Sequence, residues 1–507
     1  MNHQISRRTL LGALGLGAAA VALPGCASAV DGAGSGAGGK KVLTIAQGAD
    51  IAPATIFGQN NPNMSIARTV FNTLTEYDLR TREPRPGLAE SWQVDGETVT
   101  LKLRQGVTFH SGRPFTSADV VFALENLAKP EVATQLKHVA TAVAKVTPKG
   151  DHEVAVTFKH AVSNVFDLFE IMIIPDQESI ADLMAGRRII GTGPFKVERY
   201  TPGQGVKLVR NDKYFKPVKL DGVDIKVIAQ SQSMVSSLRS GQTHLALDLA
   251  PLDAAALKGD GRYKVVVSEA YDSAFYIASN VTVKPLDDKR VRQAIAYAVD
   301  RDRILKQVLG GIGTVSSLPW SPGSPAFDQA QAATYRYDTA KAKSLIGEAG
   351  ATGEKLDVLY NAALGTNAKI AEIVQFNLRE IGLEARAVPL QGPDFQAKLT
   401  GEGLPGLFVN GHGFGHLDPA TLIKGAFPFN AEKNASRFES AEYRKLADEL
   451  WKKPTDGTRR KVNELLLDEQ FVSDLVTSSH TFTISDRVRG LSYSMFDYLN
   501  LDEADLT

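Results

Sequence analysis

Two hydrophobic periods divide this chain into halves. In the first half, apolar and polar residues alternate with a period of two, which is typical of strands that bury one face. We therefore expect strands at 41–46, 97–103, 152–158, 205–209 and 223–227. Helices are expected over 67–74 and over 114–127, the second with Thr116 as its N-cap. The first half should accordingly be rich in strands.

In the second half, apolar residues recur at helical spacing. We expect helices over 288–309, 339–349 and 439–452. Residues 356–360, 367–380 and 384–388 follow the strand, helix, strand order of a parallel α/β unit. Two short β-branched segments, 274–279 and 481–485, suit crossings between lobes. These patterns predict an α/β protein with two lobes, and ligands prefer clefts at such domain interfaces.

The N-terminal region resembles an export signal. Arg7 and Arg8 precede an apolar run, Leu10 to Leu23, of about fourteen residues, whereas a membrane-spanning helix needs roughly 20. Residues 6–11 resemble the twin-arginine export motif, and Leu23-Pro24-Gly25-Cys26 resembles a bacterial lipobox. The alternative is a general secretory signal followed by a chance cysteine.

Cys26 is the only cysteine in the chain, so the body contains no intramolecular disulfide, zinc-thiolate site or cysteine nucleophile. Residues 27–39 are rich in Gly, Ala and Ser, as expected of a flexible tether. Lys+Arg and Asp+Glu both number 57, which gives no basic excess for nucleic acid. We expect a protein that is exported and lipid-anchored to the outer face of the cell membrane, or periplasmic.

Four stretches carry a family resemblance when taken in order. They are 86–92 with 103–122, 191–195 with 208–215, 280 with 285–301, and 337–350. The first contains LAESW and then LRQGVTFHSGRPFTSADVVF. Together they resemble the peptide/nickel-type family of extracellular solute-binding proteins, the receptors of ATP-driven importers. Most of these signature residues are expected to serve structure rather than ligand contact.

The resemblance implies a two-lobed, periplasmic-binding-protein-like fold with an inserted subdomain in the first lobe and a ligand cleft between the lobes. The expected parts are a signal peptide with lipobox (1–26), a tether (27–40), lobe I (41–273) with its subdomain (about 75–190), lobe II (274–480) and a return to lobe I (481–507). It also implies a monomeric substrate-binding component that delivers a small solute to ABC transporter permease subunits by hinge closure.

Two loops are the candidate ligand contacts. In the first, Asn60, Asn61 and Asn63 offer amides suited to an uncharged polar ligand, although the loop also fits a plain Asn/Gly/Pro turn. In the second, the candidates are Asn410, His412, Phe414, His416 and Asp418. Tyr271, Phe275 and Trp320 are aromatic candidates for the cleft wall, with core packing as the alternative.

The second loop departs from the family pattern. Asp418-Pro419 matches the family's acidic residue–proline step, but the acidic residue that pairs with a peptide's α-ammonium three positions earlier is replaced by Gly415. The family's usual Trp is also missing. A buried ammonium without a partner is costly, so we expect a glycosidic, opine-like or other polar conjugate rather than a peptide held by its α-amine.

A metal and an enzymatic function are the remaining alternatives. His412, His416 and Asp418 are acceptable nickel or zinc ligands, but a Gly-rich loop gives them no common face, so no metal site is assigned and a nickel chelate stays an alternative ligand. A surface-anchored hydrolase is the other alternative. The chain has no G-x-S-x-G, H-E-x-x-H or P-loop motif, and we expect neither catalysis nor a cofactor.

Overall fold

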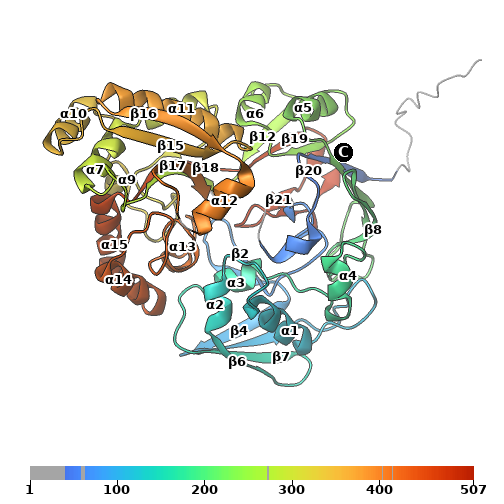
Figure 1. Cartoon of the computed structure of the whole chain (residues 1–507). Helices are drawn as coiled ribbons and strands as arrows, with labels where there is room; N and C mark the ends of the chain where they lie inside the picture. The colour runs from blue at the N-terminus through green and yellow to red at the C-terminus, as the bar shows by residue number, and fades with distance from the viewer. Residues whose placement is uncertain (1–39, 59–62, 271–272, 402, 414) are drawn as a thin grey trace, which may run out of the picture. The chain divides into compact units, whose positions relative to one another are not determined.

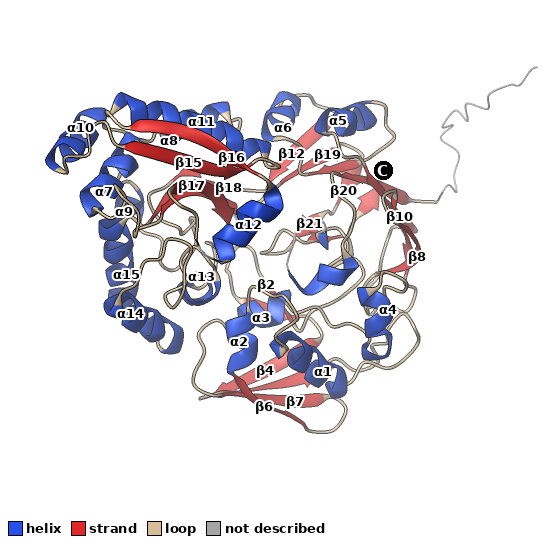
Figure 2. Cartoon of the chain, viewed as in Figure 1, coloured by secondary structure: helices blue, strands red, loops and turns tan. Residues whose placement is uncertain are grey.

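Three sheets organise the protein in a computed structural model, which describes residues 40–58, 63–270, 273–401, 403–413 and 415–507 (Figures 1 and 2). Residues 40–507 form one unit. The architecture is the expected two-lobed α/β fold with an inserted subdomain. Cys26, Asn60, Asn61, Tyr271 and Phe414 lie outside the described residues.

The sheet of lobe I joins strands from both ends of the chain. In spatial order it contains β12 (Tyr263–Val267), β19 (Thr481–Ser485), β11 (Leu245–Leu247), β1 (Val42–Gln47), β10 (Gly222–Val227), β9 (Gly205–Arg210) and β8 (Phe195–Thr201). β1 is parallel to β10 and β11, and the other pairs are antiparallel. One face packs on the main core through alternate residues such as Leu43 and Ile45. Helices α5 (Ser231–Arg239) and α6 (Pro251–Leu257) cover part of the other face.

The inserted subdomain is an antiparallel sheet with helices on it. Its strands, in spatial order, are β4 (Ala89–Asp95), β5 (Thr98–Leu103), β7 (Glu153–Phe158) and β6 (Val143–Pro148), and its helices are α1 (Ser117–Ala128), α2 (Lys137–Ala142) and α3 (Val165–Ile171). α1 begins where expected because Thr116 and Asp119 form a capping box. Short elements connect the subdomain to lobe I: β2 (Thr75–Tyr77), β3 (Pro84–Pro86), a 3₁₀ turn (Gln177–Ser179) and α4 (Ile180–Met184).

Lobe II is a six-stranded sheet flanked by helices. Its strands, in spatial order, are β14 (Thr314–Val315), β18 (Val472–Ser478), β13 (Ser273–Ser279), β17 (Leu407–His412), β15 (Lys355–Asn361) and β16 (Glu384–Leu390). Its helices are α7 (Lys289–Ala298), α8 (Arg301–Gln307), α9 (Gln329–Ala332), α10 (Thr339–Glu348), α11 (Gly365–Glu380), α12 (Gly392–Thr400), α13 (Pro419–Gly425), α14 (Ala441–Lys452) and α15 (Asp456–Glu469). β15, α11 and β16 form the expected parallel unit.

The chain crosses between the two large sheets after β12 and after β18. Ser479 and His480 make the second crossing, and the amide of Ser268, at the first, donates to the carbonyl of His480 at 3.0 Å. His480 Nδ1 lies 2.7 Å from Asp248 Oδ1 in lobe I. The Ser268 hydroxyl donates to the buried Asp497 of the C-terminal segment. That segment contains the short strands β20 (Val488–Arg489), β21 (Ser492–Tyr493), β22 (Leu499–Asn500) and β23 (Asp505–Leu506).

Two expected helices are wrong in detail. Residues 67–70 form turns and 71–74 are irregular, because Gly193 and Phe195 donate their amides to the carbonyls of Val70 and Thr69, at 2.9 and 3.0 Å, and so replace helical bonds. The helix expected over 288–309 breaks into α7 and α8. It breaks because Asp300 caps α8, accepting from the Arg303 amide at 2.9 Å.

Candidate ligand-binding site

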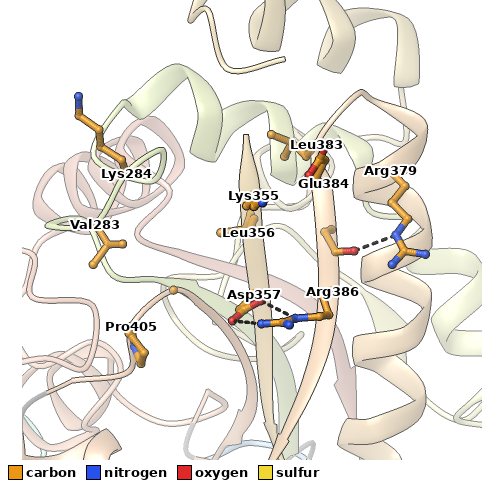
Figure 3. A pocket seen from close by; sticks show the side chains of 12 residues that line it. Val283, Lys284, Lys355, Leu356, Asp357, Arg379, Leu383, Glu384, Arg386 and Pro405 are labelled. Carbon is orange, nitrogen blue, oxygen red and sulfur yellow. Dashed lines mark hydrogen bonds and ion pairs between the residues drawn. The ribbon is translucent and has the colours of Figure 1, made fainter. Parts of the chain in front are cut away.

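A hollow of about 870 Å³ opens at the N-terminal ends of β15 and β16 (Figure 3). Three of its charged side chains bind one another or the backbone. Arg386 donates twice to Asp357, at 3.0 Å each, and Arg379 Nε donates to the Ala385 carbonyl at 2.8 Å. Ligands of open α/β sheets bind outside the carboxyl ends of the strands. This hollow is at the opposite end, so it is not the candidate site.

A second cavity, of about 800 Å³, lies at the carboxyl end of β17. Lobe I, the subdomain, lobe II and the second crossing all contribute to its wall. Lobe I provides Gly58 at the end of the 3₁₀ turn Pro53–Gly58, and the subdomain provides Pro130 and residues 132–135 with Lys137. Lobe II provides Ser273, Tyr276, Gln396, Leu399, 410–413 and 425–428, and the crossing provides His480. A solute here touches both lobes and the crossing between them.

Asn410 and Tyr276 form part of the lobe II wall. β13 and β17 are antiparallel, and Tyr276 lies directly opposite Asn410. Burial raises the pKa of Tyr276, and the hydrogen bond with the Asn410 side chain opposes this effect. The phenol therefore stays neutral and holds the Asn410 amide at the edge of the cavity.

His412 lies at the base of the same wall and is bound through both ring nitrogens. Nε2 lies 2.9 Å from Asp474 Oδ1, and Nδ1 lies 3.1 Å from the Gly413 carbonyl. The side chains of His412 and Asp474 are 2% and 4% exposed, so this is a buried pair. The imidazole therefore presents its ring to the cavity, since its nitrogens already hold the strand and the loop in place.

Gly415 has no room for a side chain. A Cβ added there would lie 2.3 Å from the Pro319 carbonyl oxygen, closer than any real Cβ contact. The Gly415 carbonyl accepts from the Ser321 amide at 2.9 Å, which fixes the loop against this segment. The backbone of Pro319 thus excludes any side chain, a carboxylate included, from this position.

His416 is buried and Asp418 is half-buried, and neither is among the residues that line the cavity. The His416 ring packs on Phe496 at 5.7 Å, and burial lowers the pKa of His416 to about 3. Asp418 caps α13 by accepting from the Ala420 amide at 2.9 Å, and burial raises its pKa. In the described part of the chain, no three His, Cys, Asp or Glu residues are placed to share a metal ion.

Asn63 and Trp320 are also buried. Asn63 is 2% exposed, and its amide exchanges two hydrogen bonds with the backbone of Ala52, at 2.8 and 3.1 Å. The Trp320 indole donates to Asn463 at 2.6 Å in the lobe II core. Phe275 is half-buried and packs against a second lobe II cluster. The structure brings Asn410 and His412 into the wall of the cavity and places these three side chains elsewhere.

Beside the cavity, a buried polar network joins the subdomain to lobe II. Asp167 on α3 accepts from the Tyr77 hydroxyl at 2.8 Å and from the Thr421 hydroxyl of α13 at 2.5 Å. Asn164 donates to Thr421 at 2.7 Å and accepts from the Trp451 indole at 3.2 Å. The sequence contains no signal for this network, because each bond between the subdomain and lobe II joins single residues more than 200 positions apart.

The wall carries little charge. Among the described residues that line the cavity, Lys137, His412 and His480 can carry a positive charge, and none is an Asp or a Glu. The Lys137 ammonium donates to the carbonyls of Leu127, at 2.6 Å, and Lys129 at the end of α1. The described lining therefore consists mainly of amide and hydroxyl groups, backbone atoms and apolar side chains. Such a surface suits a polar solute that carries little positive charge.

Comparison with known proteins places the fold and the site in context. A model of the bacterial extracellular solute-binding proteins, family 5 Middle, matches residues 83–434. The chain is 29% identical over 432 residues to the di/tripeptide-binding protein 1 of Pseudomonas aeruginosa, with 78% of this chain and 80% of that protein covered. It is 27% identical over 493 residues to the heme-binding protein A of Haemophilus influenzae, with 88% of each covered.

A solved structure supports the fold alone. The periplasmic binding protein AgaA of A. tumefaciens R10, in complex with agropinic acid, matches with a TM-score of 0.78. The match covers 92% of this chain and 99% of that chain at 21% identity. Within the described ranges, no helix combines the length and the apolar character needed to cross a bilayer.

Proposed function

The chain belongs to the family 5 bacterial extracellular solute-binding proteins, and on that premise we propose that it is the exported, lipid-anchored receptor of an ABC importer. The cavity of about 800 Å³ carries the proposal, because lobe I, the subdomain, lobe II and a crossing all contribute to its wall. A solute in that cavity favours the closed state by contacting both lobes at once. The closed receptor then meets the permease subunits as a monomer.

The ligand in this proposal is a polar solute that is not held by an α-ammonium group. The family's acidic partner for that group is replaced by Gly415, and a Cβ there would clash with the Pro319 carbonyl. The described lining also contains no acidic residue. Desolvating an ammonium without a partner costs several kcal/mol, so a glycosidic, opine-like or N-blocked conjugate fits better than a free peptide. Asn410 and, outside the described residues, Asn60, Asn61, Tyr271 and Phe414 remain its proposed contacts.

Calorimetric titration tests the ligand class. We expect a dipeptide and tripeptide library to bind weakly and glycosides or opine-like conjugates to include the better ligands. Asn410→Ala should weaken the best of these, whereas Asn500→Ala, in β22 and not among the residues that line the cavity, is the control. Micromolar binding of ordinary peptides that is lost on acetylation of the α-amine would overturn this assignment. Recovery of the bound ligand in unchanged form would distinguish a receptor from a hydrolase, because a hydrolase would convert it.

The anchor and the export route are tested separately. Cys26→Ser should release the protein from the membrane fraction, because no other cysteine is available for acylation. Replacement of Arg7 and Arg8 by Lys should block export through the twin-arginine route. Continued membrane retention of Cys26→Ser, or normal export of the double variant, would contradict the respective assignment.

A further inference from the structure

At one end of the lobe I sheet, no helix of the described chain covers the outer face, and this face is basic. Leu208 and Val223 point into the core, so their neighbours Lys207 and Asp224 lie on the opposite face. Arg199 on β8 is the register partner of Lys207 on β9. α5 and α6 pack around Ala46 and β11, nearer the middle of the sheet. In Figure 1, β8 is an outer edge of the fold.

Beyond the edge strand the basic surface continues into a cavity of about 560 Å³. Its wall contains Arg187, Arg188, Lys196 and Arg199, with Glu198 as its one acidic residue among those described. Asp182 lies 2.7 Å from Arg187 and 3.9 Å from Arg188 and neutralises one of the two. Within the described chain, Lys196, Arg199 and Lys207 form no ion pair. Asp224 in β10 is the register partner of Lys207 and lies on the same face. The five cations Arg187, Arg188, Lys196, Arg199 and Lys207 still outnumber Asp182, Glu198 and Asp224, so this face has a local positive excess although the protein has no net charge.

The strand register places the basic face beside the start of the folded unit. Lys196 pairs with Val209, Val209 with Gly222, and Gly222 with Val42, the first residue of β1. Four strands in a row at ~4.8 Å put Lys196 about 14 Å from Val42. Residues 27–39 are a Gly-rich segment that spans at most ~45 Å when fully extended. A membrane attached at Cys26 is therefore within reach of this face.

We propose that this basic face, comprising Arg187, Arg188, Lys196, Arg199 and Lys207, docks on the anionic phospholipid headgroups of the membrane that carries the anchor. The location of that membrane rests on the proposed Cys26 anchor, whereas the affinity for headgroups rests on the face alone. Clustered cations next to a lipid anchor bind anionic lipid surfaces by electrostatic attraction. Docking holds one edge of lobe I on the membrane and leaves lobe II free to move during closure.

Sedimentation with vesicles tests the proposal on the chain carrying Cys26→Ser, which has no thiol to acylate. We expect binding to phosphatidylcholine vesicles that contain phosphatidylglycerol, loss of that binding at high salt, and none to pure phosphatidylcholine. The triple variant Lys196→Gln, Arg199→Gln, Lys207→Gln should lose about fivefold per cation, or about a hundredfold in all. The matched control replaces the exposed Lys343, Lys369 and Lys461 of lobe II by Gln and should retain binding.

Equal binding to neutral vesicles, or equal loss in the two triple variants, would overturn the proposal. Tight one-to-one binding of inorganic phosphate that displaces the vesicles at constant ionic strength would assign the face to a free anion instead and would also overturn it. Ligand titration of the triple variant should match the parent chain. If the protein does not bind vesicles, the proposed receptor function is unaffected. If Cys26→Ser is not released from the membrane, the vesicle result still holds, because it was measured without the anchor.

Discussion

Asp167→Asn tests the network that joins the subdomain to lobe II. Asp167 is fully buried on α3, and its carboxylate accepts the hydroxyls of Tyr77 and Thr421. Burial raises its pKa to about 7, and the nearby Asp418 carboxylate adds to this, while the two hydroxyl bonds oppose it. Asn keeps the shape of the protonated acid and removes the charge. The variant should therefore behave as the protein does when Asp167 is protonated.

The magnitude follows from the difference between the folded and unfolded pKa. An unfolded Asp titrates at ~3.9, and each pH unit is worth ~1.4 kcal/mol, so the difference from about 7 is at most ~4 kcal/mol. Because the folded pKa is the higher one, the protonated form stabilises the fold. That stability is fully present below pH ~4 and is lost as the pH rises to about 7. The hydroxyl that Asn leaves without an acceptor costs about 1 kcal/mol at every pH.

Urea unfolding followed by tryptophan fluorescence, from pH ~5 to pH ~8, measures the effect. The wild-type free energy of unfolding should fall relative to that of Asp167→Asn by up to ~3 kcal/mol over this range, because part of the ~4 kcal/mol is already lost by pH ~5. Glu170 and other groups common to both chains cancel in the difference. Asp302→Asn, on the exposed face of α8, controls for loss of a charge. Parallel curves for wild type and Asp167→Asn would refute the reasoning, because Asp167 would then be ionised at no cost.

Three further changes probe the loop and its supports. Gly415→Ala should lower the free energy of unfolding by ~1–3 kcal/mol through overpacking against Pro319, whereas Gly261→Ala, which meets nothing within 4 Å, should be neutral; equal effects would contradict the steric argument. Asp474→Ala should lower the free energy of unfolding by ~3–5 kcal/mol, because it leaves the buried His412 without its partner. A double-mutant cycle with His412→Ala should give a coupling energy of ~1–3 kcal/mol, and additive effects of the two substitutions would show that the pair does not interact. Arg82→Lys should lower the free energy of unfolding in urea by ~1–3 kcal/mol, because the guanidinium donates to the carbonyls of His416 and Pro322 at 3.0 and 3.3 Å. An unchanged urea midpoint would show that this bridge does not stabilise the fold.

Local signals in the sequence were enough to predict most elements. The strands expected at 97–103 and 223–227 appear as β5 and β10, because alternation needs only a sheet with one buried face. Thr116 and Asp119 predicted the start of α1, since both halves of a capping box lie within one turn. The same logic was available at Asp300, whose capping of α8 marks the break in the expected long helix. The ordered motifs also identified the family, which the family model confirms.

Contacts between distant segments decided the rest. Residues 67–74 have helical composition, but their carbonyls accept amides from residues more than 100 positions away, and these bonds outcompete a short helix. Gly415 was readable as a missing carboxylate, but the Pro319 carbonyl that excludes any side chain there is set by folding. The pairing of Asp167 with Thr421 likewise has no trace in either segment alone. Periodicity and caps are properties of neighbours in the chain, whereas a ligand cavity is made where unrelated segments meet, and only the tertiary structure determines which segments those are.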